Sequence, residues 1–99
     1  MFKIKMEWEL NNGKKFSEWT IPWDIAYAEK ETGETLYSII IKEAPPTLEQ
    51  QFHMAFNIQR RITDKPVGSF ENWKSSVVHI LSKDFQTTNF TNPEASTDS

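Results

Sequence analysis

Cysteine is absent from this 99-residue sequence, and its three glycines stand at isolated positions, Gly13, Gly33 and Gly68. Without cysteine the chain has no disulfide framework, no thiolate nucleophile and no cysteine-ligated zinc or iron–sulfur site. A phosphate-binding loop needs clustered glycines, so the isolated ones exclude the common nucleotide-binding motifs. These absences remove several classes of enzyme and cofactor-binding protein, and they suit a reducing compartment.

Positive charge is also scarce in the sequence. The 11 Lys+Arg oppose 14 Asp+Glu for a formal net charge of -3, and the only two arginines are adjacent, at Arg60 and Arg61. A nucleic-acid-binding surface needs a stripe of basic residues that neutralises phosphates. We therefore expect a mildly acidic protein with no nucleic acid among its partners.

Long hydrophobic runs are missing as well. The longest apolar stretches span a few residues, whereas a helix needs about 20 apolar residues to cross a bilayer. The first residues alternate Lys with Phe and Ile, unlike the apolar centre of a signal peptide. We expect a soluble cytoplasmic protein that has no membrane partner.

Aromatic residues are abundant, with four Trp, seven Phe and two Tyr. Each can bury roughly 150–250 Å² of surface, so a few of them suffice for a small core. A chain of this length has room for one such core. The sequence predicts a single compact domain over residues 1–85.

The N-terminal third has the pattern of a β-hairpin. Residues 2–10 alternate apolar and charged side chains, which is typical of a half-buried strand. The Asn11-Asn12-Gly13 segment suits a turn, and residues 14–21 supply a return strand with Phe16, Trp19 and Ile21. The three-residue spacing of Phe16 and Trp19 makes this return strand less regular and favours either a bulge or an early exit from the ladder.

A short helix is predicted to follow the hairpin. Pro22 suits the first turn of a helix, Asp24 complements the helix dipole, and Gly33 suits the left-handed residue that ends helices. Residues 36–41, LYSIII, are compatible with a buried strand or with one or two turns of helix. The sequence leaves these two alternatives open.

Two amphipathic helices are predicted in the C-terminal half. Thr47 and Gln50 have the spacing of a capping box, and a three- and four-residue apolar repeat continues to about Thr63. Ser69 suits the cap of a second helix, whose repeat contains Phe70, Trp73, Val77, Ile80 and Leu81. The short connection predicts antiparallel packing of the pair, and residues 86–99 read as a flexible polar tail. The predicted class is therefore α+β.

No residue set has the spacing of a catalytic or metal site. Glu49 and His53 lie four apart on a predicted helix, which is two ligands where zinc needs at least three. The acidic run around Glu31 is typical of a solvated face, and no serine lies in a nucleophile motif. We expect a protein without catalytic residues, metal or cofactor.

The candidate functional residues are therefore surface contacts: Trp19, Trp23, Arg60 and Arg61. Aromatic residues and arginines dominate the binding energy of many protein interfaces. The alternative is internal, with the tryptophans filling the core and the arginines complementing the C-terminal dipole of a helix. Both interpretations stay open at the level of the sequence.

The order of several short segments resembles a known family. They are WDIAYAEKETG at residues 23–33, FHMAFNIQRR at 52–61, SFENW at 69–73 and NPE in the polar tail at 92–94. In this order they resemble the small tail-assembly chaperones of long-tailed bacteriophages, over roughly residues 20–95.

This resemblance implies a non-enzymatic role in the host cytoplasm during virion morphogenesis. Such chaperones bind the long helical tape-measure protein and assist assembly of the tail tube, with the tail-tube protein as a further partner. The implied stoichiometry is either several copies on one partner chain or a homo-oligomer. The alternative function is that of a small structural protein in the tail or neck of the virion.

Overall fold

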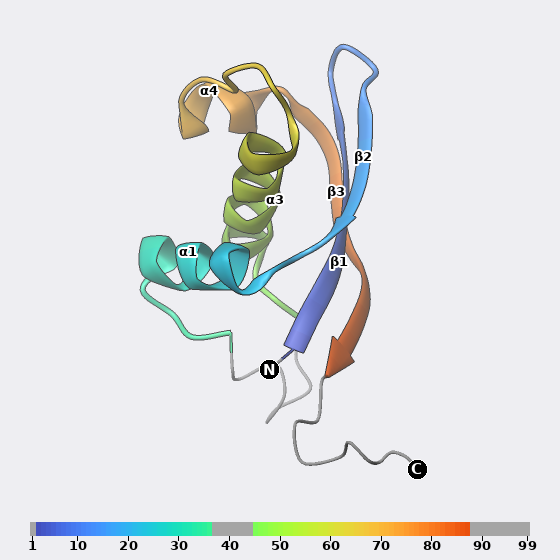
Figure 1. The fold of residues 1–99 in the computed structure, drawn as a ribbon. Helices are drawn as coiled ribbons and strands as arrows, with labels where there is room; N and C mark the ends of the chain where they lie inside the picture. Colours follow the sequence, from blue (N-terminus) through green and yellow to red (C-terminus); the bar gives the residue numbers. More distant parts are fainter. Residues whose placement is uncertain (1, 37–44, 88–99) are drawn as a thin grey trace.

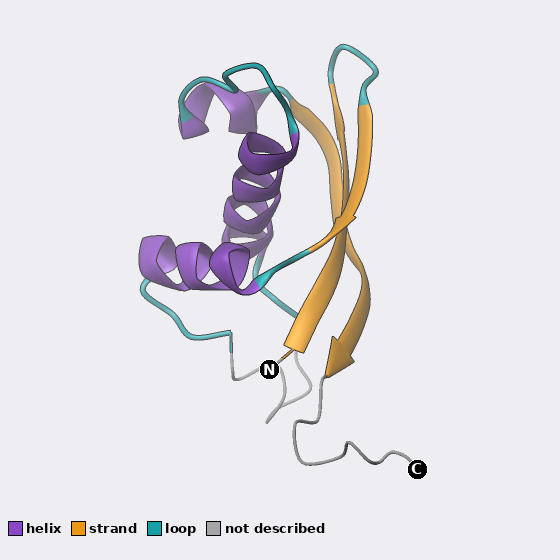
Figure 2. Cartoon of the chain, viewed as in Figure 1, coloured by secondary structure: helices purple, strands orange, loops and turns teal. Residues whose placement is uncertain are grey.

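The computed structural model describes residues 2–36 and 45–87, which form a three-stranded sheet with helices on one of its faces (Figure 1). Strand β1 is central, and β2 and β3 pair with it on opposite sides, both antiparallel. The α+β class predicted from the sequence is confirmed (Figure 2). In chain order the elements are β1 (Phe2–Leu10), β2 (Lys15–Trp19), α1 (Pro22–Thr32), α3 (Leu48–Ile62), α4 (Phe70–Ser75) and β3 (Val77–Thr87).

The alternation in β1 places one row of its side chains in the core. Ile4, Met6 and Trp8 are at most 1% exposed, and Leu10 is also buried. Successive side chains of a strand point to opposite faces, so this row faces the helices. The core that forms between sheet and helices also contains Met54, Ala55, Phe56, Ile58 and Trp73.

The predicted hairpin is confirmed. Trp8 pairs with Phe16 and Lys5 pairs with Trp19 in the β1–β2 register. The connection turns at Gly13, whose φ of 88° lies in the left-handed region that glycine adopts readily. The register shows no bulge between Phe16 and Trp19; instead, β2 ends at Trp19, before Ile21, and the chain leaves the sheet toward α1.

The two longer helices begin where their capping residues predict. Helix α1 starts at Pro22 and ends at Thr32, and it is capped by Gly33, whose backbone N–H donates to the Glu29 carbonyl at 2.9 Å. Before α3, the Thr47 hydroxyl accepts from the Gln50 N–H, and the Gln50 side chain accepts from the Thr47 N–H. This reciprocal capping box satisfies backbone donors that the helix itself leaves unpaired.

The helix predicted over residues 70–81 is wrong in its second half. Helix α4 ends at Ser75, and the residues from Val77 onward form β3, which pairs along β1. The Ser76 hydroxyl donates to the Trp73 carbonyl at 2.6 Å, which competes with continuation of the helix. The free edge of β1 then offers these residues backbone partners, and their β-branched side chains fit a pleated sheet.

Two further sequence predictions concern segments at the limits of the described structure. Gln86 and Thr87 belong to β3, so the polar tail does not begin at residue 86 as predicted. Residues 88–99 of the predicted tail lie outside the described residues, as do residues 37–41 of the ambiguous segment 36–41. Leu36, the one described residue of that segment, is fully buried.

Across residues 2–36 and 45–87, none of the helices combines the length and the apolar composition that a membrane crossing requires.

Candidate functional site

A buried carboxylate organises the surface that carries the candidate residues. Asp24 lies in the first turn of α1 and is 0% exposed. Its Oδ2 accepts from the Ile21 backbone N–H at 2.8 Å, and its Oδ1 accepts from the Asn57 amide at 2.8 Å. Buried charge of this kind is tolerated only when it is paired and hydrogen-bonded.

Arg61 supplies the opposite charge from the last turn of α3. Its Nη2 lies 2.8 Å from Asp24 Oδ2, and its Nε lies 3.2 Å from both carboxylate oxygens. The same Nη2 donates to the Trp19 carbonyl at 3.1 Å. Arg61 therefore joins the end of β2, the start of α1 and the end of α3, and its polar contacts are internal to the fold.

Arg60 has a different environment from its neighbour. Its guanidinium lies over the ring of Tyr27 at 4.9 Å and over the ring of Phe56 at 4.7 Å. It also donates to the Asn57 side-chain oxygen at 2.6 Å. The residue is exposed, so Arg60 presents a positive charge on an aromatic base at the surface.

Trp23 is the most exposed large apolar residue among those described, at 64%. Ile21, two residues earlier, is 43% exposed. Trp23 and Tyr27 are four residues apart in α1 and so lie on the same side of the helix. We call the set of Ile21, Trp23, Tyr27 and Arg60 the Trp23 surface; it combines apolar, aromatic and cationic groups.

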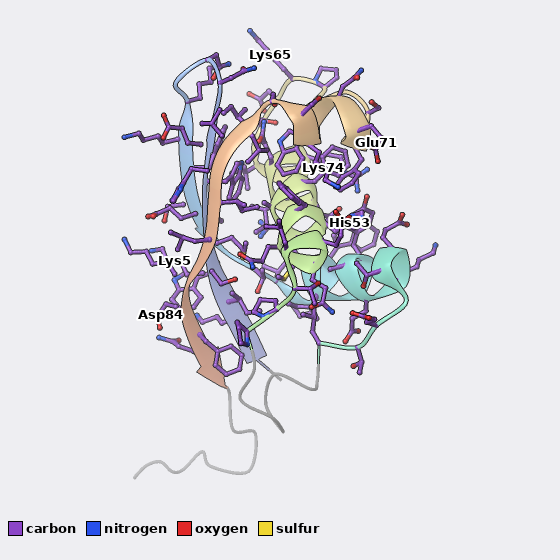
Figure 3. The ribbon with its side chains drawn as sticks, turned by 180° about the vertical axis from the view of Figure 1, so that it is seen from behind. Lys5, His53, Lys65, Glu71, Lys74 and Asp84 are labelled. Atoms are coloured by element: carbon purple, nitrogen blue, oxygen red, sulfur yellow. The ribbon has the colours of Figure 1, made fainter. Side chains whose placement is uncertain are left out.

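Trp19 does not join the Trp23 surface. It pairs in register with Lys5, whose row of β1 faces away from the helices, as Figure 3 shows for Lys5. The ammonium groups of Lys3 and Lys5 lie 4.7 and 5.7 Å from the centroid of its half-buried ring. The structure therefore places Trp19 and Trp23 on different faces, although the sequence places them on either side of one short corner.

The other two tryptophans are internal. Trp8 and Trp73 are 1% and 3% exposed, and both indole N–H groups donate to Oε1 of Gln59, at 3.0 and 2.8 Å. The internal interpretation thus holds for these two, while Trp23 is on the surface. Gln59 satisfies both indoles, although no motif or spacing in the sequence marks it for this role.

His53 and Glu49 are close to each other, as their helical spacing predicts. Their Nε2 and Oε1 atoms are 4.0 Å apart, and Glu49 also pairs with Lys74, which lies near His53 in Figure 3. The His53 ring is buried, and its centroid lies 4.0 Å from the centroid of the Phe70 ring. This burial lowers the pKa of His53. Among the residues that the structure describes, no group of three or more His, Cys, Asp or Glu is arranged to hold a metal ion.

Comparison of the chain with protein-family models, with curated proteins and with solved structures gave no match. The chemistry of the exposed side chains and the motif order of the sequence are therefore the grounds for a functional proposal.

Proposed function

We propose that this chain is a phage tail-assembly chaperone, a non-catalytic protein that binds the tape-measure protein and assists tail-tube assembly in the host cytoplasm. Two observations support the proposal. One is the resemblance of its motif order to that family. The other, which carries the structural part, is the 64% exposure of Trp23 on a helix whose backbone is anchored by a buried ion pair.

The anchoring of α1 matters because binding is favoured when the contact residues are already ordered. Asp24 follows Trp23 directly, and its carboxylate is held by Arg61 and Asn57 from α3. Trp23 is therefore presented on a fixed backbone, and less conformational entropy is lost when a partner binds. Aromatic side chains that a partner covers on binding contribute most of the binding energy in many interfaces.

The chemistry of the Trp23 surface suits an amphipathic helix. Trp23 and Ile21 would cover an apolar stripe on the partner, and the exposed guanidinium of Arg60 would face an acidic residue beside that stripe. A long helical partner offers many such stripes, so several chaperone copies would bind one tape-measure chain. This arrangement would keep apolar helices from associating before the tube forms around them.

Co-expression with the tape-measure protein of the same genome tests the proposal. We expect a soluble complex with the parent chain and loss of that complex with Trp23→Ala. Val78→Ala is the matched control, because Val78 is also an exposed apolar residue, at 60%, but lies on β3. Failure of the parent chain to bind or solubilise the tape-measure protein would overturn the proposal.

Mass spectrometry of mature virions separates this function from that of a small structural tail or neck protein. A chaperone leaves the assembly, so its peptides should be absent from purified particles. Their presence at a stoichiometry comparable to other tail proteins would favour the structural alternative.

A further inference from the structure

The orientation of the Gln59 carboxamide follows from its two indole partners. Trp8 Nε1 and Trp73 Nε1 lie 3.0 and 2.8 Å from Gln59 Oε1. An indole N–H donates and cannot accept, so the atom that faces both rings must be the oxygen. The amide nitrogen, Nε2, is thereby directed away from the two rings.

Nε2 has no hydrogen-bond partner of its own in the described part of the chain, where the Gln59 side-chain bonds are the two that Oε1 accepts. Gln59 is 8% exposed, yet its amide nitrogen is not sealed from solvent. The amide nitrogen can therefore donate to water, or to a ligand that approaches from the solvent side.

Gln59 lines a cavity of about 630 Å³ between the β1–β2 turn and the α3–α4 connection. We call it the Gln59 cavity. Its apolar wall includes Phe16, Val67 and Trp73. Its volume falls within the roughly 300–1,000 Å³ typical of ligand sites, which leaves room for one large side chain and its adjoining backbone.

The charged residues that line the Gln59 cavity are two lysines, Lys14 and Lys65, and one aspartate, Asp64. All three are exposed. Figure 3 shows Lys65 at the same end of the molecule as the β1–β2 turn. The charge of these lining residues is positive, although the formal net charge of the chain is -3. This local charge favours an anionic group in the cavity.

We propose that the Gln59 cavity binds the C-terminal residue of a partner polypeptide. The terminal carboxylate would accept a hydrogen bond from Gln59 Nε2, beside the ammonium groups of Lys14 and Lys65. The apolar side chain of that residue would pack against Phe16, Val67 and Trp73. Capture of a chain terminus by directed N–H donors is a recurring mode of peptide recognition, and a charged acceptor strengthens the bond.

The Gln59 cavity is separate from the Trp23 surface, and it shares no residue with it. The inference therefore does not depend on the tape-measure proposal, and a failure of one leaves the other standing.

The two indole N–H groups give a direct readout of binding, because both donate to the residue that would contact the ligand. We would titrate ¹⁵N-labelled protein with N-acetyl-Gly-Gly-Leu, and with the analogues ending in Phe or Val, up to about 5 mM. The same peptides with a C-terminal amide are the control. We expect saturable shifts of the Trp8 and Trp73 indole signals with a carboxylate peptide, and binding weaker by about tenfold with its amide.

Gln59→Glu is the sharpest variant, since it keeps an oxygen toward the indoles and replaces only the outward nitrogen by a second oxygen. We expect it to lose carboxylate binding. If it does not fold, the exposed double variant Lys14→Gln/Lys65→Gln should reduce the preference for carboxylate over amide, whereas Lys30→Gln on α1 should not. Equal binding of both peptide forms, absence of saturable shifts with every peptide, or an unchanged preference in the double variant would each overturn the proposal.

Discussion

Arg61 and Asp24 are 37 residues apart in the sequence, yet Arg61 Nη2 lies 2.8 Å from Asp24 Oδ2 and closes the last turn of α3 onto the first turn of α1. The carboxylate is fully buried, while the arginine side chain is 27% exposed. The pair therefore fixes the position of the helix that carries Trp23.

Removal of Arg61 should be strongly destabilising, because it leaves the Asp24 carboxylate buried without its charge partner. We expect Arg61→Ala to lower the free energy of unfolding by about 3–5 kcal/mol. Arg60→Ala is the matched control, since it leaves Asp24 paired and removes the guanidinium from the rings of Tyr27 and Phe56 together with its hydrogen bond to Asn57. Urea unfolding of both variants tests this, and equal losses would contradict the role assigned to Arg61.

Gln59 should matter for stability as well as for binding, because one oxygen serves two buried indoles. Gln59→Leu leaves two buried donors unsatisfied, each at a penalty of roughly 1–3 kcal/mol, so we expect a total loss of about 2 kcal/mol or more. Gln51→Leu on the same helix is the control, since Gln51 is only half-buried and bonds a single backbone carbonyl. Urea unfolding that finds both variants equally stable would show that the indole bonds are weak.

The stability of the fold should depend on pH through His53. Burial lowers its pKa from the ordinary value of 6.5, against the opposing influence of Glu49, Glu31 and Glu71. The unfolded chain therefore binds a proton more readily than the folded one, and stability present above about pH 6.5 is lost as the pH falls through the lowered folded-state pKa. We expect the urea midpoint to decrease on acidification from about pH 7.5 to about pH 5.

Two variants isolate the contribution of His53 to this slope. His53→Phe keeps a ring against Phe70 and Tyr27 and should flatten the dependence between about pH 7 and pH 5. His79→Gln changes an exposed residue of β3 and should leave the slope as it is. An unchanged slope in His53→Phe would assign the pH dependence to other groups.

The loss of stability on replacing a tryptophan by alanine should depend on how deeply that tryptophan is buried. Trp73→Ala removes a ring that is 3% exposed and should lower the free energy of unfolding by about 3–5 kcal/mol. Trp23→Ala removes a ring that is 64% exposed and should change stability by less than about 0.5 kcal/mol. Thermal or urea unfolding measures both, and a large loss for Trp23→Ala would mean that its role is structural.

Local signals account for the elements that the sequence predicted correctly. The alternation in Phe2–Leu10 and the turn at Gly13 involve residues within one hairpin, and the caps at Thr47 and Gly33 act within one helical turn. The apolar repeat of α3 likewise needs only its own residues to define a buried face. Such features are visible before any packing occurs.

The error over residues 70–81 has a different origin. Trp73, Val77 and Ile80 follow helical spacing, but Val77–Leu81 is also a short apolar run that a strand accommodates. The free edge of β1, about 70 residues earlier in the chain, decides between the two. A partner that distant leaves no trace in the local pattern, so tertiary pairing overrides the local preference.

Some features of the candidate site could likewise be predicted from the sequence, and others depend on the fold. Trp23 and Arg60 could be chosen by residue type, because exposed aromatic and arginine side chains are common at interfaces. The separation of Trp19 from Trp23 depends on the β1–β2 register, and the internal role of Arg61 depends on a carboxylate 37 residues away. Neither relationship has a signal in the neighbouring sequence.

By itself, the sequence determined the α+β class, the hairpin, the starts of α1 and α3 and the absence of cysteine chemistry, because each depends on composition or on neighbouring residues. Only the tertiary structure decided that residues from Val77 onward form a strand, which tryptophans are buried, and that Gln59 accepts from two indoles and lines a cavity. These outcomes depend on which backbone edges and polar groups meet across long sequence separations. Such long-range contacts follow from burial and hydrogen-bond pairing across the whole core.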